Sequence, residues 1–80
     1  MKAKQKPMPR MGLSIRDRVI AKEGTSYAGY GMGFIIEFLD DPSAGNNGAA
    51  LVLFHQHPTW GMVECGIRPY INTDELTKVK

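Results

Sequence analysis

The sequence predicts an all-β fold, a small five-stranded barrel with one short helical turn before the last strand. Three observations support this prediction. The apolar segments are short, they are rich in β-branched and aromatic residues, and clusters of turn-forming residues separate them. At 80 residues the chain is one domain, of the size at which a core only just sustains folding. We expect a flexible basic arm over residues 1–12 and the barrel over residues 13–80.

The first predicted strand is Asp17–Lys22, where β-branched residues alternate with polar ones. The second predicted strand is Gly29–Leu39. Within it, Gly29, Gly31 and Gly33 leave one strand face without side chains. The opposite face carries large apolar residues, namely Tyr30, Met32, Phe34, Ile36 and Phe38. Glycine inside a strand marks a bend or a close backbone approach. We therefore expect a strongly bent second strand.

A long loop is expected over residues 40–48, where Asn47-Gly48 favours a positive φ. Ala50–Phe54 is a continuous apolar run, typical of a buried strand, and His55–Thr59 is expected to turn the chain. The remaining predicted elements are a strand at Trp60–Cys65, a helical turn at Asn72–Leu76 and a last strand at Leu76–Val79.

Charge is distributed unevenly along a chain whose net charge is +2. Residues 1–22 carry seven basic side chains and one acidic side chain, whereas residues 23–77 carry one basic and seven acidic side chains. A basic arm of this kind would reach an anionic partner such as nucleic acid. A solubilising terminus explains the same charges, so both interpretations stay open.

The composition predicts where in the cell the protein is located. No apolar run approaches the roughly 20 residues of a membrane span, and the first residues lack the apolar segment of a signal peptide. The one cysteine, Cys65, excludes an intrachain disulfide and predicts a reducing, cytoplasmic location. We expect Cys65 to be a buried structural thiol.

Three kinds of chemistry receive little support from the residues. His55 and His57 have the spacing that places two imidazoles on one strand face, but zinc needs three or four ligands and Cys65 is the only other candidate. Nothing resembles an oxyanion hole beside Cys65. The glycine run lacks the spacing and the following helix of a phosphate-binding loop. We therefore expect no metal, no cofactor and no catalytic residue.

Aromatic and basic residues remain as candidates for binding. Phe34, Phe38 and Phe54 lie in apolar runs and are expected in the core, whereas other rings flank turns. Such rings with lysines and arginines would form a stacking platform for single-stranded nucleic acid, a groove for a protein partner, or plain core. The candidate binding residues are Lys2, Lys4, Lys6, Arg10, Arg16, Arg18, Tyr30, Trp60, Arg68 and Tyr70.

Residues 15–79 resemble the SH3-like small barrels in the order of their elements. Asp17-Arg18-Val19 opens the first strand, the second strand begins with glycines, and Asp74-Glu75-Leu76 precedes the last. The resemblance implies the fold and says little about activity. With the charge and aromatic pattern, it predicts a non-catalytic binding module that contacts nucleic acid or a protein within a larger assembly, and that is compatible with a homo-oligomer.

The first half also resembles the plasmid-borne type II dihydrofolate reductases. The shared positions are Asp17, Arg18, Val19, Gly24, Tyr27, Gly29, Gly33, Phe34, His57 and Pro58. That family lines its pore with a Val-Gln-Ile-Tyr segment, which is absent here, and its active-site lysine would fall on Ala21. The resemblance implies an alternative function, an oligomeric reductase that uses NADPH.

Overall fold

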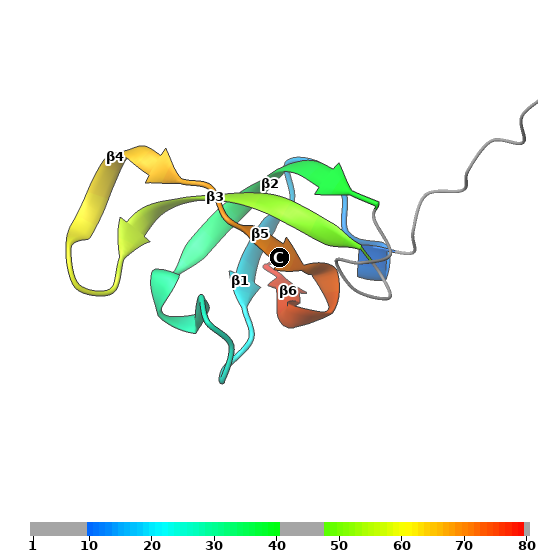
Figure 1. The fold of residues 1–80 in the computed structure, drawn as a ribbon, viewed down its shortest axis with the longest axis horizontal. Helices are drawn as coiled ribbons and strands as arrows, with labels where there is room; N and C mark the ends of the chain where they lie inside the picture. The colour runs from blue at the N-terminus through cyan, green and yellow to red at the C-terminus, as the bar shows by residue number, and fades with distance from the viewer. Residues whose placement is uncertain (1–9, 41–47, 80) are drawn as a thin grey trace, which may run out of the picture.

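A computed structural model describes residues 10–40 and 48–79 of the chain and shows a fold that is mostly antiparallel β-sheet (Figure 1). The strands are β1 (Arg18–Ala21), β2 (Met32–Leu39), β3 (Ala49–His57), β4 (Gly61–Ile67), β5 (Tyr70–Asn72) and β6 (Leu76–Lys78). Three short 3₁₀ turns complete the described part, η1 (Arg10–Gly12), η2 (Ala28–Tyr30) and η4 (Thr73–Glu75). The all-β prediction is confirmed. Of the predicted arm, residues 1–9 lie outside the described residues.

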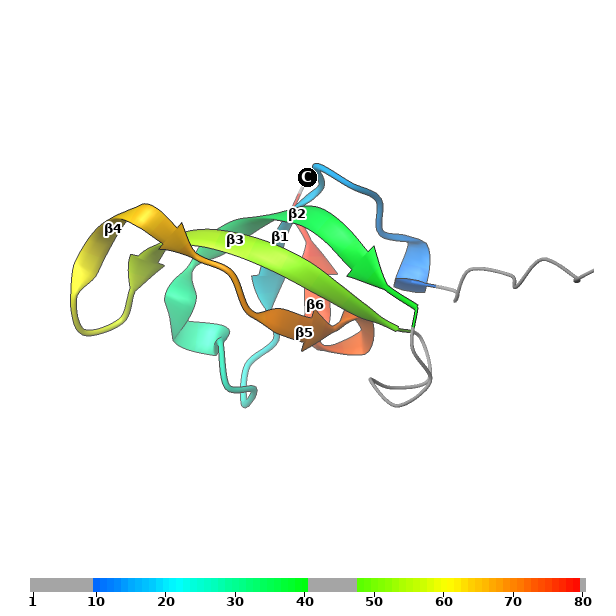
Figure 2. The same ribbon diagram turned by 45° about the horizontal axis from the view of Figure 1, so that its top comes forward.

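The strands form one sheet in the order β4-β3-β2-β1-β6, and β5 also pairs with β3. In the described residues β4 and β6 are the two ends of this order, so the sheet is not closed. Figure 2 shows β5 beside β3, and η4 leading the chain to β6. Within residues 10–40 and 48–79, no helix is long and apolar enough to cross a membrane.

The prediction of five strands is wrong because a sixth strand, β5, forms after Pro69. Ala49 pairs with Asn72 and Leu51 with Tyr70, while Val52 donates its N–H to the Pro69 carbonyl at 3.0 Å. Backbone pairing therefore makes a strand of three residues whose side chains show no clear strand pattern. The predicted helical turn before the last strand is confirmed as η4, and the first and last predicted strands correspond to β1 and β6.

The predicted strand Gly29–Leu39 is two elements. Residues Ala28–Tyr30 form the turn η2, and β2 begins at Met32. Gly31 separates them with a φ of 75°, a left-handed conformation that glycine adopts readily. The break changes the side on which the next side chain lies, so Tyr30 packs against the core while Met32 is exposed.

Gly33 confirms the prediction that a strand glycine marks a close approach. A Cβ atom added to Gly33 would lie 2.7 Å from Cγ1 of Val52 and 2.8 Å from Cδ1 of Phe54. Both neighbours belong to β3, and Gly33 pairs directly with Phe54 in the sheet. The Phe54 ring thus uses the space that a side chain at residue 33 would occupy.

The predicted turn at His55–Thr59 is wrong at its start, since β3 continues to His57. The Nδ1 atom of His57 accepts the backbone N–H groups of Thr59 and Trp60 at 3.0 and 3.2 Å. A side chain at the end of the strand therefore holds the tight turn that leads to β4. In the long loop, Gly48 has the positive φ that was expected, and residues 41–47 lie outside the described residues.

Candidate binding surfaces

The sheet has an apolar outer face, defined here as Ile20, Met32, Phe34, Ile36, Leu51 and Leu53. Register places these residues side by side, since Ile20 pairs with Met32 and Phe34 pairs with Leu53. Ile20, Met32, Phe34 and Ile36 are between 38 and 42% exposed, and the two leucines are half-buried. Three neighbouring strands therefore present one continuous apolar surface to solvent.

A β-bulge extends the outer face. The register of β2 against β3 shifts between Ile35 and Glu37, so Ile36 is an extra residue in the ladder. Ile36 and Glu37 are both exposed, whereas Ile35 before them is fully buried. The bulge thus places an apolar and an acidic side chain next to each other at the same edge of the outer face.

The expectation that Phe34 belongs to the core is wrong. Gly33 and Ile35 face the interior, and strand alternation directs Phe34 outward with Met32. Phe54, also expected in the core, is fully buried, and Phe38 is half-buried against the core. The glycine side of β2 is therefore the core side, because the Phe54 ring from β3 fills it.

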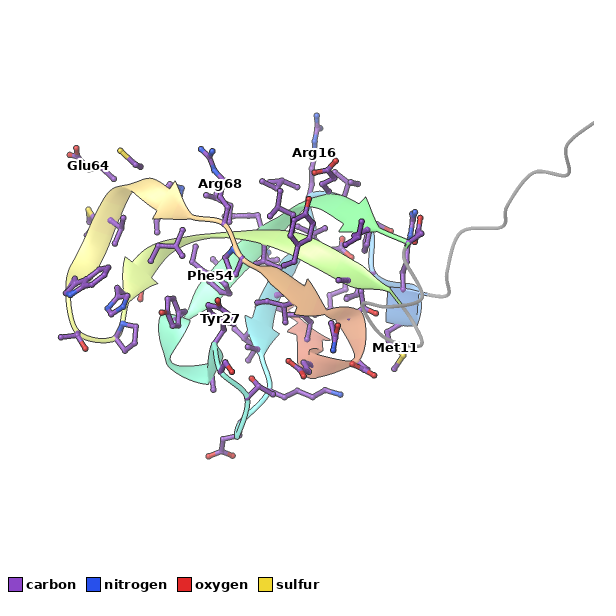
Figure 3. The ribbon with its side chains drawn as sticks, in the orientation of Figure 1. Met11, Arg16, Tyr27, Phe54, Glu64 and Arg68 are labelled. Atoms are coloured by element: carbon purple, nitrogen blue, oxygen red, sulfur yellow. The ribbon has the colours of Figure 1, made fainter. Side chains whose placement is uncertain are left out.

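Arginines border the outer face. Arg18 pairs with Phe34, and Arg16 and Arg68 project from one side of the molecule while Tyr27 lies on the other (Figure 3). In the part of the chain that the structure describes, none of these three arginines forms a salt bridge. Glu37 is a carboxylate on this surface, and its Oε2 accepts a long hydrogen bond of 3.4 Å from the Tyr70 hydroxyl. The border is positively charged overall.

A second apolar surface is the hairpin tip, defined here as residues 58–62, which comprise the turn after β3 and the first two residues of β4. Its Trp60 and Met62 are 72 and 82% exposed. The indole of Trp60 stacks on the His57 ring with centroids 3.7 Å apart and planes 12° from parallel. His57 in turn contacts Tyr30, and Tyr30 contacts the buried Phe54. A chain of ring contacts therefore connects the tip to the core.

The predicted stacking residues and the predicted cations lie in different places. His57 links Trp60 to Tyr30, so the structure brings these two predicted residues into one cluster. Tyr30 is half-buried, however, and residues 24–67 contain no lysine or arginine. Arg68 projects on the side of the molecule away from Tyr27, which packs on Tyr30 at 4.9 Å. The rings at the tip have no adjacent basic side chain in the sequence.

Arg10 has a local structural role. It forms a two-pronged pair with Asp40, and its guanidinium lies 4.3 Å from the centre of the Phe38 ring. The hydrogen bond that Arg10 donates to Asp40 raises the pKa of Arg10 above its ordinary value. This predicted binding residue therefore has an acidic partner within the chain. Lys2, Lys4 and Lys6 lie outside the described residues.

The expectation that Cys65 is buried is wrong, because the residue is exposed on β4. Near it, four residues of β4, Val63 to Gly66, face the single residue His55 between the paired positions Phe54 and Gln56. The Nδ1 atom of His55 lies 3.2 Å from the Val63 carbonyl oxygen. Across residues 10–40 and 48–79, no three His, Cys, Asp or Glu residues are grouped for a metal ion, and no pocket is found.

Comparisons with protein-family models, with curated proteins and with solved structures found no match to this chain. The outer face is the surface that sequence reasoning missed. No signal in the sequence marked it, because the side that the glycine of β2 faces follows from the pairing of Gly33 with Phe54 in the sheet. The hairpin tip was found in part, through Trp60.

Proposed function

We infer that this chain is a non-catalytic, SH3-like module that binds a protein through its outer face, as a subunit of a larger assembly. The observation that carries this proposal is the row of exposed apolar side chains at Ile20, Met32 and Phe34, continued by Leu53. These side chains lie on the side of the sheet opposite the buried core cluster. An exposed contiguous apolar patch of this kind is typical of an interaction site.

Support for an SH3-like architecture comes from the strand order. β1, β2 and β3 are antiparallel neighbours, and β6 returns through the turn η4 to pair with β1. The bulge at Ile36 bends β2, and bulges of this kind allow a sheet to curl around a core. The inner side of this curl holds the buried residues of every strand except β4.

The surface chemistry favours a protein over a nucleic acid. An apolar centre bordered by Arg16, Arg18 and Arg68 matches the composition of protein interfaces, in which arginine is enriched and a polar rim surrounds an apolar core. A single-strand binding surface needs accessible rings along a basic groove. Here the most exposed ring, Trp60, lies in a segment, residues 24–67, that contains no lysine or arginine.

Site-specific photo-crosslinking tests the proposal. A photoreactive phenylalanine would replace Phe34 in the full-length chain, in the cells in which the chain is naturally made. A matched control would carry the same group at Glu23, an exposed position in the loop after β1 that projects away from Arg16 and Arg68 (Figures 1 and 3). We expect a crosslinked protein from position 34 and none from position 23. Crosslinking to nucleic acid, or no crosslinking at position 34, would overturn the proposal.

A further inference from the structure

We propose that the occupant of the outer face is the hairpin tip of a second copy of this chain, so that copies associate head to tail. This inference rests on the proposed function and names its partner. It requires two surfaces on one molecule that fit each other and that are far enough apart to act on different neighbours. The outer face and the hairpin tip meet both requirements.

Both surfaces are apolar and exposed, and one of them protrudes. Trp60 and Met62 protrude at the end of the β3–β4 hairpin, which extends beyond the rest of the sheet (Figure 1). The outer face offers a strip of aliphatic and aromatic side chains from three strands. Tryptophan is the residue most enriched among the anchors of protein interfaces, and methionine is also enriched there. Contact between the two would remove apolar surface of both from water.

Charge supports the same pairing. The residues from His57 to Ile67 contain one charged side chain, Glu64, which is exposed on β4. The border of the outer face carries Arg16, Arg18 and Arg68 and the carboxylate of Glu37. An acidic hairpin approaching a positively charged border gains long-range attraction. Two outer faces brought together would instead place the same arginines opposite each other.

The geometry predicts an association that propagates. Because the tip and the outer face are different surfaces, their contact is heterologous and gives rings or chains of copies. Two protruding side chains bury much less than the roughly 800 Å² per partner of a stable complex. We therefore expect weak association that rises with concentration.

A mixing experiment with full-length protein tests this arrangement. The tip variant combines Trp60→Ser and Met62→Ser and keeps the outer face; the face variant, Phe34→Asp, keeps the tip. A second face variant, Met32→Asp, serves if Phe34→Asp does not fold, as judged by circular dichroism. Met11→Ala is the matched control, because Met11 is also exposed but lies at the other end of the molecule (Figure 3).

Sedimentation should show the wild type and Met11→Ala with a weight-average mass that rises about twofold or more with concentration. The tip variant alone and the face variant alone should stay monomeric. Their equimolar mixture should form a dimer and nothing larger, with NMR shifts at Ile20 and Met32 of the tip variant and at the Trp60 indole of the face variant.

Two results would overturn the inference. If the tip variant associates like the wild type while the face variant is monomeric, the outer faces bind each other. If every sample stays monomeric, the occupant is not a second copy. In both cases the crosslink at position 34 still decides whether the outer face binds a protein at all. The sedimentation experiment therefore tests the identity of the partner, and the crosslinking experiment tests the proposed function.

Discussion

The paired strands β2 and β3 carry apolar residues on both faces, but the two faces have opposite environments. Ile35 on the inner side is fully buried, as are Val52 and Phe54 on β3, whereas Met32 and Phe34 on the outer side are about 40% exposed. The same strands, a single residue apart, thus build both the core and a solvent-facing surface. Apolar side chains do not by themselves indicate which side of a sheet will be buried.

The difference arises from what the rest of the chain covers. Leu13, Ile71 and Leu76 join the inner residues in one buried cluster, and they come from segments before β1 and from β5 and β6. These segments pass over the inner side. On that side, the absence of a side chain at Gly33 leaves room for the Phe54 ring. Among the described residues, no comparable set of buried side chains covers the outer face. The inner side serves stability, and we assign the outer side to binding.

The largest expected effect separates the two phenylalanines. Phe54→Ala removes a fully buried ring and should lower the free energy of unfolding by about 3–5 kcal/mol. Phe34→Ala removes a ring that is already 39% exposed and should cost about 1 kcal/mol or less. Urea denaturation followed by circular dichroism measures both values. Equal losses would show that the outer ring is part of the core and would remove the basis for a binding face.

A smaller effect is expected at the glycine that defines the inner side. In Gly33→Ala the new methyl group would meet Val52, Phe54 and the Leu53 carbonyl oxygen, all at less than 3 Å. Overpacking of this kind should destabilise the chain by about 2 kcal/mol. Gly24→Ala is the control, since its φ is +87° but nothing lies within 4 Å, and conformational strain alone should cost about 1 kcal/mol. Thermal unfolding compares them, and a tolerated Gly33→Ala would contradict the close approach of β3.

Much of the fold was predictable because local patterns decide it. A β-branched pair gives β1, a continuous apolar run gives β3, the acidic residues Asp74 and Glu75 indicate η4, and Gly48 adopts the positive φ that Asn47-Gly48 indicates. β5 was not predictable, because backbone pairing with β3 makes it a strand. The break at Gly31 was missed for a similar reason. A glycine run is compatible with both strand and turn, and the packing of Tyr30 on Phe54 selects the turn.

The candidate site was predictable in part. Trp60 and Tyr30 were both predicted as binding residues from their turn-flanking positions, but their connection through the His57 ring was not. The outer face was missed because the sequence alone does not say which side the glycines face. The resemblance to type II dihydrofolate reductases stays a prediction. In this chain the region compared with the family's pore segment includes Val63–Gly66, which faces His55 as a bulge of β4.

The smallest expected effect lies at the end of the inner side, where Arg10 covers Phe38 and pairs with Asp40. Arg10→Ala should lower the free energy of unfolding by about 0.5–1 kcal/mol, because the pair is partly exposed and the ring contact is close to the surface. The pKa of Arg10 is raised by its hydrogen bond to Asp40, so this stabilisation is fully present below the ordinary pKa of arginine and is lost only as pH rises beyond it. Urea denaturation at about pH 6 and pH 9 should therefore give the same difference between variant and wild type, since arginine stays charged throughout this range. Arg68→Ala is the control, because Arg68 borders the outer face and should leave stability unchanged; a loss as large as that of Arg10→Ala would mean that the border arginines hold the fold as well.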